Sequence, residues 1–226
     1  MATWRQILKK KISYNKAMEE ITIRRAVLSD LPYLYEICLK TGDESKDATP
    51  FFSDPYTIGQ YYVAPYLIYP NGICFVAECG YRPQGYIIAV PDTLTFGQWM
   101  EEEWLPPIRE RYPQPFPLSL SGKEDNIIKL LHKCQFPVDT AALPWLADYP
   151  AHLHIDLLPC IQQKGIGRAL MNELFAELAQ QKVSGLHLGV GSSNTGAVSF
   201  YKKVGFSVLL EQKWGFTMGK LFDAGR

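Results

Sequence analysis

The chain has 226 residues, of which 47% are hydrophobic and 13% aromatic, so it can bury a substantial core. Lys and Arg together number 23 and are balanced by 23 Asp and Glu, which gives a net charge of zero and no electrostatic basis for nucleic-acid binding. No apolar run approaches the length of a transmembrane helix and no signal-peptide pattern is present, so we expect a cytoplasmic protein without a membrane partner.

The five cysteines argue against two common cysteine frameworks. Their number is odd and no C-x-x-C pair occurs, which disfavours both a disulfide scaffold and a zinc site, and we expect no metal. Four of them lie in apolar or aromatic surroundings, so we predict buried free thiols. Cys160 follows Pro159 in a turn and could lie near a ligand, but no partner that would activate its thiol is evident.

The first part of the chain combines strand, helix and hairpin patterns. In order, we predict a strand over 21–26, a helix capped by Ser29-Asp30, a polar loop over 41–53, a tyrosine-rich helix over 55–67, and a hairpin of strands over 73–78 and 85–90.

The composition changes between Pro91 and Pro150, where prolines recur among three tryptophans. A structureless loop of this length would be unusual in a compact domain. We therefore predict one domain over 1–226 that carries an insertion over 92–148, with short helices such as one over 125–134. The aromatic residues of the insertion suggest that it packs on the main body, over a pocket.

The second half is more regular. We predict a strand over 151–158, a helix over 168–182, a strand over 186–190, a helix from Asn194 to about Lys203 that ends before Gly205, and closing strands over 206–210 and 215–221.

The turn after the strand over 151–158 is the most informative motif. It has the pattern Gln162-x-x-Gly165-x-Gly167 and opens a helix. Glycines let backbone N–H groups approach a ligand, and a helix N-terminus attracts an anion, most often a phosphate. Lys164 and Arg168 oppose the helix dipole, so they are poorly placed unless a negative ligand binds beside them.

A second motif follows about thirty residues later, Asn194-x-x-Ala197-x-x-Phe200-Tyr201-x-x-x-Gly205-Phe206. Together the two motifs and their order resemble the GCN5-related N-acetyltransferases, the GNAT family, over residues 151–210 and more loosely over 21–90. The segment from Asp148 to Pro159 is more narrowly similar to the acetyltransferase-like domain of O-GlcNAcases and its free-standing bacterial relatives. The resemblance implies an α/β (α+β) fold with a mixed central β-sheet flanked by helices.

The resemblance also implies an acyltransferase that moves an acetyl group from acetyl-CoA to a primary amine, in a small molecule or in a protein lysine. The pyrophosphate of coenzyme A would lie on the amides of the turn, and its pantetheine arm along the edge of the preceding strand. A backbone N–H of that strand could stabilise the oxyanion. The implied cofactor-binding residues are Leu157, Leu158, Gln162, Gln163, Lys164, Gly165, Ile166, Gly167, Arg168, Asn194 and Tyr201.

Acyl transfer to an amine needs a proton acceptor, and it needs an acid for the departing thiolate. The resemblance assigns the acid to Tyr201, although its helical stripe with Phe200 and Val204 is equally typical of a core tyrosine. Asn194 has the same ambiguity, because a helix N-cap explains it without any contact to the cofactor.

The proton acceptor is an open question at the level of sequence. His152, His154 and Asp156 share one face of their strand by two-residue alternation. His154 and Asp156 are candidates for a proton-accepting pair, or they close a polar spot beneath the insertion. Glu78 is a distant candidate, and His187 is expected to be structural.

Few sequence features indicate which molecule accepts the acetyl group. The aromatic residues that could line its pocket are Tyr61, Tyr62, Tyr66, Trp99, Trp104 and Tyr149. A different class of function also stays open, a catalytically inactive module that binds a peptide, a sugar or a protein partner on the same scaffold. Retention of Gly165 and Gly167 favours competent binding of coenzyme A. A homodimer stays open as well.

Overall fold

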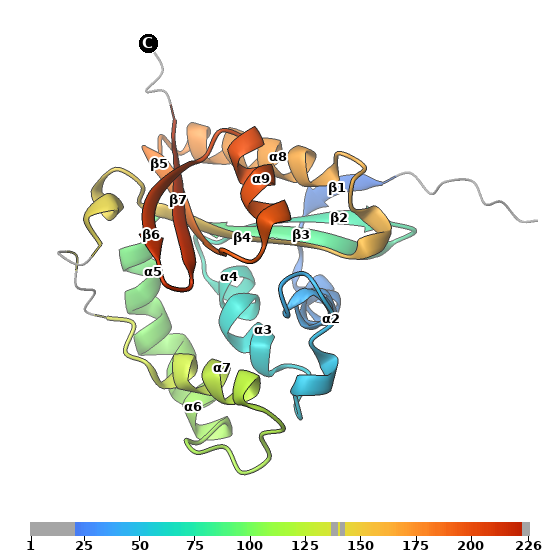
Figure 1. Cartoon of the computed structure of the whole chain (residues 1–226), viewed down its shortest axis with the longest axis vertical. Coiled ribbons are helices and arrows are strands. Elements are labelled where there is room, and N and C mark those ends of the chain that lie inside the picture. The colour runs from blue at the N-terminus through green and yellow to red at the C-terminus, as the bar shows by residue number, and fades with distance from the viewer. Residues whose placement is uncertain (1–20, 137–139, 141–142, 223–226) are drawn as a thin grey trace, which may run out of the picture.

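The computed structural model describes residues 21–136, 140 and 143–222. A seven-stranded sheet with the order β1-β2-β3-β4-β5-β7-β6 divides it, with α8 and α9 on one face and α2 to α7 on the other (Figure 1). The strands are β1 (Thr22–Arg25), β2 (Ile73–Cys79), β3 (Arg82–Val90), β4 (Ala151–Leu157), β5 (Gly185–Gly191), β6 (Ser207–Gln212) and β7 (Gly215–Leu221). The helices are α2 (Leu31–Thr41), α3 (Thr57–Tyr62), α4 (Ala64–Ile68), α5 (Thr93–Trp99), α6 (Leu105–Arg111), α7 (Gly122–His132), α8 (Ile166–Gln180) and α9 (Thr195–Lys203).

Each face of the sheet has its own hydrophobic core. On one face, the apolar stripe of α8, with Leu170, Leu174 and Leu178 fully buried, packs on the sheet. On the other face, α2 to α4 and the helices of residues 93–132 share one cluster with β2 and β3. The predicted mixed sheet flanked by helices is therefore confirmed. No helix in the described part of the chain is long and apolar enough to cross a membrane.

The sheet opens between β4 and β5, its one parallel pair of neighbours. Only Ala151 and His152 are paired with β5, through Leu186 and His187, whereas β4 pairs with β3 from His152 to Leu157. The two strands part beyond this contact. One edge of β4 is consequently left without a strand partner over its second half.

Three local predictions are wrong, each for a physical reason. The helix expected over 55–67 is two helices, because the chain breaks at Val63 (φ −133°) and Pro65 lacks an N–H donor. Asp30 does not cap α2 with its side chain, since its carboxylate accepts hydrogen bonds from Arg24 and from the Val27 N–H. Burial of the free thiols is found for Cys38 and Cys74, but Cys134 is exposed.

Residues 93–132 are anchored to the main body by a buried carboxylate. Glu124, on α7, is fully buried and accepts hydrogen bonds from the backbone and hydroxyl of Ser53 at 2.9–3.1 Å and from the Leu120 N–H at 2.9 Å. A buried carboxylate needs several donors to offset its lost hydration. Glu124 therefore fixes α7 against the segment that leads into α3.

Candidate functional site

The turn between β4 and α8 has a series of backbone N–H groups without acceptors. No described residue accepts a hydrogen bond from the N–H groups of residues 163–168, whereas the Ala169 N–H bonds to the Gly165 carbonyl at 3.0 Å. Gln163 (φ 59°) and Gly165 (φ 80°) are both left-handed, a geometry that gathers successive amides into a concave array. The turn is thus built to bind an anion.

The two glycines of the turn serve different purposes. A side chain at Gly165 would meet no atom within 4 Å, so its left-handed φ is what requires glycine there. Gly167 is buried, and a Cβ at that position would lie 3.3 Å from Leu157 and from Phe200. Gly165 therefore shapes the anion site, whereas Gly167 permits close packing of α8 on β4 and α9.

The polar side chains of the turn mainly fasten its flanks. Gln162 donates a hydrogen bond to the Leu157 carbonyl at 2.7 Å. Arg168 donates to the Lys203 carbonyl at the end of α9, at 3.2 Å, and so links the turn to that helix. Lys164 is exposed at the rim of the turn.

The free edge of β4 presents backbone groups toward the gap between β4 and β5. Because the Leu158 N–H donates to Gln84 on the β3 side, alternation directs the N–H and carbonyl groups of Ile155 and Leu157 toward the opposite edge. The ladder with β5 has already ended at His152. A peptide-like ligand can therefore pair with this edge, while the Leu157 side chain packs in the core.

Helix α9 faces the same region. Asn194 is its N-cap and accepts the Ala197 N–H at 3.1 Å, as predicted, and its amide group also donates to Ser45 at 3.3 Å. Tyr201 is only 8% exposed, and it packs against Phe206. Burial and the nearby Asp156 carboxylate both raise the pKa of Tyr201, so the phenol stays protonated.

Asp156 and His154 do not form a mutual hydrogen bond but have separate partners. The Tyr86 hydroxyl, itself fully buried, donates to Asp156 at 2.5 Å. Burial raises the pKa of Asp156, against the effect of hydrogen bonds from Tyr86 and Thr41. The distant candidate Glu78 is ion-paired with Arg24.

A chain of hydrogen bonds links the two histidines of β4. His154 Nε2 lies 3.0 Å from the Tyr66 hydroxyl, which lies 2.7 Å from His152 Nε2. His152 Nδ1 lies 2.8 Å from the Thr93 hydroxyl, and this hydroxyl lies 2.6 Å from the Pro150 carbonyl. Residues from α4, β4 and α5 thus form one continuous polar path.

The carbonyl at one end of this path determines which group donates in each of its hydrogen bonds. The carbonyl of Pro150 can only accept, so at 2.6 Å the Thr93 hydroxyl must donate to it. Thr93 then accepts from His152 Nδ1–H, which leaves His152 Nε2 to accept from Tyr66. Tyr66 in turn accepts from His154 Nε2–H. His154 is therefore left with an unprotonated Nδ1, which no described residue contacts by a hydrogen bond.

Burial keeps these imidazoles neutral. Desolvation, assisted by His187, lowers the pKa of His154 to about 4, and desolvation lowers that of His152 well below its ordinary value. His187 donates from Nδ1 to the Tyr149 carbonyl at 2.7 Å, and its pKa is also lowered by burial.

Acid is expected to destabilise the fold through these histidines. Between pH 6.5 and 4 this histidine is protonated in the unfolded chain but stays neutral in the folded protein, so the free energy of unfolding falls as the pH falls. From pH 7 to 4.5, His154 alone should lower the free energy of unfolding by about 2 kcal/mol. The measurement is the free energy of unfolding by denaturant at both pH values. His154→Gln should show a correspondingly smaller loss, and an identical loss in both proteins would contradict the assignment.

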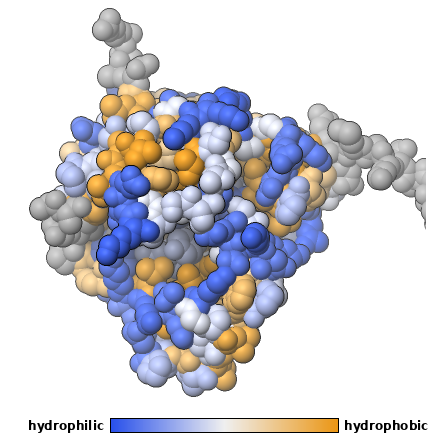
Figure 2. Space-filling view, viewed as in Figure 1, coloured by the Kyte–Doolittle hydropathy of each residue, from blue (hydrophilic) through white to orange (hydrophobic). Residues whose placement is uncertain are grey.

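The side chains of this polar path line a cavity of about 650 Å³, to which Tyr66, Thr93, His152 and His154 all contribute. His154 and Leu153 of β4 and Leu188 and Gly189 of β5 form its sheet side, at the point where the two strands part. The face of the molecule seen in Figure 1 is hollowed between the sheet and the helices below it. Hydrophobic residues lie in this hollow and hydrophilic ones surround it (Figure 2). The other described lining residues come from α3 to α5 and from elsewhere in the chain: Met100, Leu130, Lys133, Cys134, Gln135, Leu143, His152 and His187.

Three of the six predicted aromatic residues line this cavity, Tyr61, Tyr62 and Tyr66. Trp99 and Trp104 do not; they stack on each other at 6.3 Å, and Trp104 donates its indole N–H to the Gln60 carbonyl. Tyr149 is also outside the lining.

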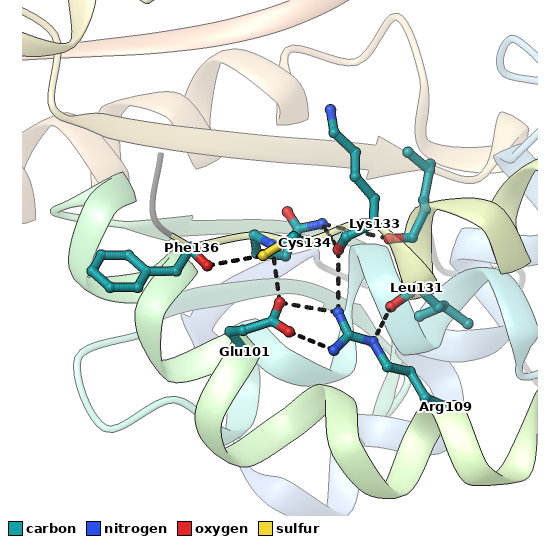
Figure 3. A network of polar contacts seen from close by, with 8 residues as sticks. Glu101, Arg109, Leu131, Lys133, Cys134 and Phe136 are labelled. Carbon is teal, nitrogen blue, oxygen red and sulfur yellow. Dashed lines mark hydrogen bonds and ion pairs between the residues drawn. The ribbon is translucent and has the colours of Figure 1, made fainter. Parts of the chain in front are cut away.

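The wall of the cavity after α7 is held by an ion pair. Arg109 forms two hydrogen bonds with Glu101, at 2.5 and 3.0 Å, and also donates to the carbonyls of Leu131 and Lys133 (Figure 3). Glu101 accepts the backbone N–H of Gln135 at 2.9 Å. The Lys133 side chain extends away from this pair. The wall is therefore fixed through its backbone.

The structure gathers much of the predicted set around one opening of the sheet. His154, Asp156 and Leu157 come from β4, the glycine turn continues from it, and Tyr201 lies close enough to Asp156 for the carboxylate to affect its pKa. Sequence reasoning missed Tyr66 as a hydrogen-bonding residue, and it missed Thr93 entirely. Among the described residues, no group of three His, Cys, Asp or Glu side chains could hold a metal ion.

Comparisons with known proteins agree with this geometry. The model of the acetyltransferase (GNAT) family matches residues 143–206. The chain is 31% identical to SsHAT, whose crystal structure superposes with a TM-score of 0.79 over 89% of this chain and 98% of SsHAT. It is 31% identical over 109 residues to the [ribosomal protein bS18]-alanine N-acetyltransferase of Escherichia coli K12, which covers 48% of this chain and 64% of that enzyme.

The chain is also 24% identical over 184 residues to the protein O-GlcNAcase of Rattus norvegicus. The match covers 81% of this chain but 20% of the O-GlcNAcase, so the chain spans only about a fifth of that relative. The family model, the similarity along almost all of SsHAT, and the glycine turn beside an opened β4 edge lead to the same conclusion: this chain belongs to the GNAT family of acetyl-CoA-dependent acyltransferases.

Proposed function

We propose that the protein transfers an acetyl group from acetyl-CoA to an amine that binds in the 650 Å³ cavity. The observation that carries this proposal is the position of the cavity. It opens where β4 and β5 part, and the glycine turn lies at the far end of the same β4 edge. An anion site, a free strand edge and an acceptor pocket therefore follow one another along a single line.

The residues fit the parts of coenzyme A in that order. The amides of residues 163–168 would hold the pyrophosphate, and the free backbone groups of Ile155 and the free N–H of Leu157 would pair with the pantetheine arm. Asn194 and Tyr201 would flank the arm from α9. The bound thioester supplies an activated acetyl group. The β4 edge contributes N–H donors suited to an oxyanion beside it.

His154 is the general base in this proposal. Its Nδ1 is unprotonated and unpaired among the described residues, and its Nε2–H is committed to Tyr66. When Nδ1 takes a proton from the attacking amine, the Nε2 proton can move to Tyr66 while the Tyr66 proton moves to His152 Nε2. The positive charge is thereby shared with His152, whose Nδ1–H is held by Thr93. Tyr66, His152 and Thr93 are positioning residues that support His154.

Tyr201 is the proposed acid. The Asp156 carboxylate and burial keep its hydroxyl protonated, so it can donate to the departing sulfur. Asp156 is thereby assigned an electrostatic role. It is not assigned proton transfer, because the Tyr86 hydroxyl already occupies its carboxylate at 2.5 Å.

Acetyl-CoA binding and thiol release test the proposal. At one hundred times its dissociation constant, a ligand stabilises the fold by about 2.7 kcal/mol, so the Tm should rise by about 5 to 10 °C. Calorimetry should give saturable acetyl-CoA binding, and a panel of amines should include acceptors that release free coenzyme A thiol. Absence of acetyl-CoA binding would refute the proposal. Binding without thiol release from any amine would favour an inactive binding module.

A further inference from the structure

The cavity also limits the chemistry of the acceptor, an inference that rests on the proposed function. We propose that the acceptor is a small molecule with a flat apolar body, an amine that is uncharged at neutral pH, and an anionic group that pairs with Lys133. Arylamines bearing a carboxylate or a phosphate have this chemistry.

The dimensions and walls of the cavity favour a small molecule. Its volume of about 650 Å³ is typical of small-ligand pockets. Tyr61, Tyr62, Tyr66 and Phe96 all line it, so much of its wall is aromatic and suited to a flat apolar body. Tyr62 packs edge-on against His154 at 5.2 Å and Phe96 packs against Tyr66 at 4.7 Å, which fixes these rings in place. The wall after α7, held by Arg109 and Glu101, contributes Lys133, Cys134 and Gln135 to the lining.

The charges around the cavity argue against a cationic amine. No Asp or Glu is among the described residues that line it. Its three histidines are neutral at physiological pH, because burial lowers the pKa of each. A buried ammonium without a carboxylate partner is strongly disfavoured. An amine that is already neutral in water enters without that penalty and presents its lone pair for attack.

Two carboxylates close in sequence to lining residues have other partners. Asp156, two residues beyond His154, accepts the Tyr86 hydroxyl and does not line the cavity. Glu101, next to the lining residue Met100, is bonded to Arg109 and to the Gln135 N–H. Neither is free to receive an ammonium group from the acceptor.

Lys133 gives the cavity its one formal charge among the described lining residues. Its backbone carbonyl is held by Arg109, while its side chain extends away from the Glu101–Arg109 pair (Figure 3). No described carboxylate lies within ion-pair distance of it. A fixed backbone with an uncompensated ammonium at the rim is suited to an anionic group on the ligand.

The experiment compares matched acceptors on the full chain with acetyl-CoA, following thiol release. We expect kcat/KM for p-aminobenzoate to exceed that for p-aminobenzamide about five- to tenfold, since the two differ in the charge of one substituent. 4-Aminophenyl phosphate distinguishes a phosphate from a carboxylate. p-(Aminomethyl)benzoate, whose amine is protonated at pH 7, should be the poorer acceptor and should improve as the pH rises.

Substitutions separate the role of Lys133 from general effects. Lys133→Gln should abolish the preference for p-aminobenzoate over p-aminobenzamide, and Lys133→Arg should retain it. Lys129→Gln is the matched control, because Lys129 is exposed on α7 and does not line the cavity. Acetyl-CoA affinity should be unchanged in all three variants.

Two results would overturn the inference while leaving acetyl transfer intact. One is equal activity with p-aminobenzoate and p-aminobenzamide, and the other is a higher kcat/KM for a lysine peptide than for either arylamine. If acetyl-CoA binds but no arylamine is acetylated, calorimetry should measure whether p-aminobenzoate binds to the complex of the protein with coenzyme A. Absence of binding, or binding unaffected by Lys133→Gln, would also overturn it. Failure to bind acetyl-CoA at all would refute the proposed function itself.

Discussion

Replacing Gly165 with glutamate is expected to lower the affinity for acetyl-CoA by about a hundredfold or more. The new carboxylate would occupy the concave array of amides of residues 163–168 and repel a pyrophosphate there. Because a Cβ at Gly165 meets no atom within 4 Å, the fold should survive, and the left-handed φ of 80° should cost about 1 to 2 kcal/mol of stability. Titration calorimetry of acetyl-CoA measures the loss.

Gly122→Glu is the matched control for this experiment. Gly122 also stands at the start of a helix with open space around it, but at α7, where Ser121 already caps the helix. Acetyl-CoA affinity should be unaffected by this substitution. Wild-type affinity in Gly165→Glu, with the protein still folded, would show that the turn does not bind the pyrophosphate.

Replacing His154 with glutamine should lower kcat by about two to three orders of magnitude without altering acetyl-CoA affinity. Glutamine can still donate a hydrogen bond to Tyr66, but it offers no basic nitrogen in place of the unprotonated Nδ1. Tyr66→Phe, which interrupts the path to His152, should cause a smaller loss. Steady-state kinetics with a neutral amine measures both effects.

The pH profile provides an independent check on this base. For an acceptor that does not itself titrate, activity should decline only as the pH approaches 4, where His154 gains a proton, and this acid limb should be absent from the residual activity of His154→Gln. His132→Gln is the control, because His132 bonds to the Tyr112 carbonyl outside the cavity and its loss should not change the profile. Full activity in His154→Gln would refute the role of His154.

The parts of the site that the sequence predicts well are those built from neighbours in the chain. A strand, a glycine turn and a helix N-terminus lie within about twenty residues, so their geometry follows from local backbone preferences. The same is true of Asn194, whose side chain accepts the N–H three residues later. The positions of these residues in the fold match the prediction, while their roles in binding stay predictions.

The remaining parts of the site depend on contacts between segments that are distant in the sequence, and no local sequence pattern predicts these contacts. Tyr66 is 86 residues from His152, and Thr93 is 59 residues from it. Which polar residue meets which histidine is decided by how the helices pack on the sheet. Glu124 illustrates the same limit, because a glutamate in the first turn of α7 is typical of an exposed residue, yet Ser53, 71 residues away, supplies donors that bury it.

The way the cavity wall is attached bears on how its specificity can be changed. Arg109 and Glu101 hold the carbonyls of Leu131 and Lys133 and the N–H of Gln135, groups that every amino acid except proline provides. Lys133 and Cys134 can therefore be exchanged without releasing the segment that carries them. Evolution or a combinatorial library could vary the lining at these positions on an unchanged scaffold, and so change the amines that fit the proposed acceptor cavity while the glycine turn stays the same.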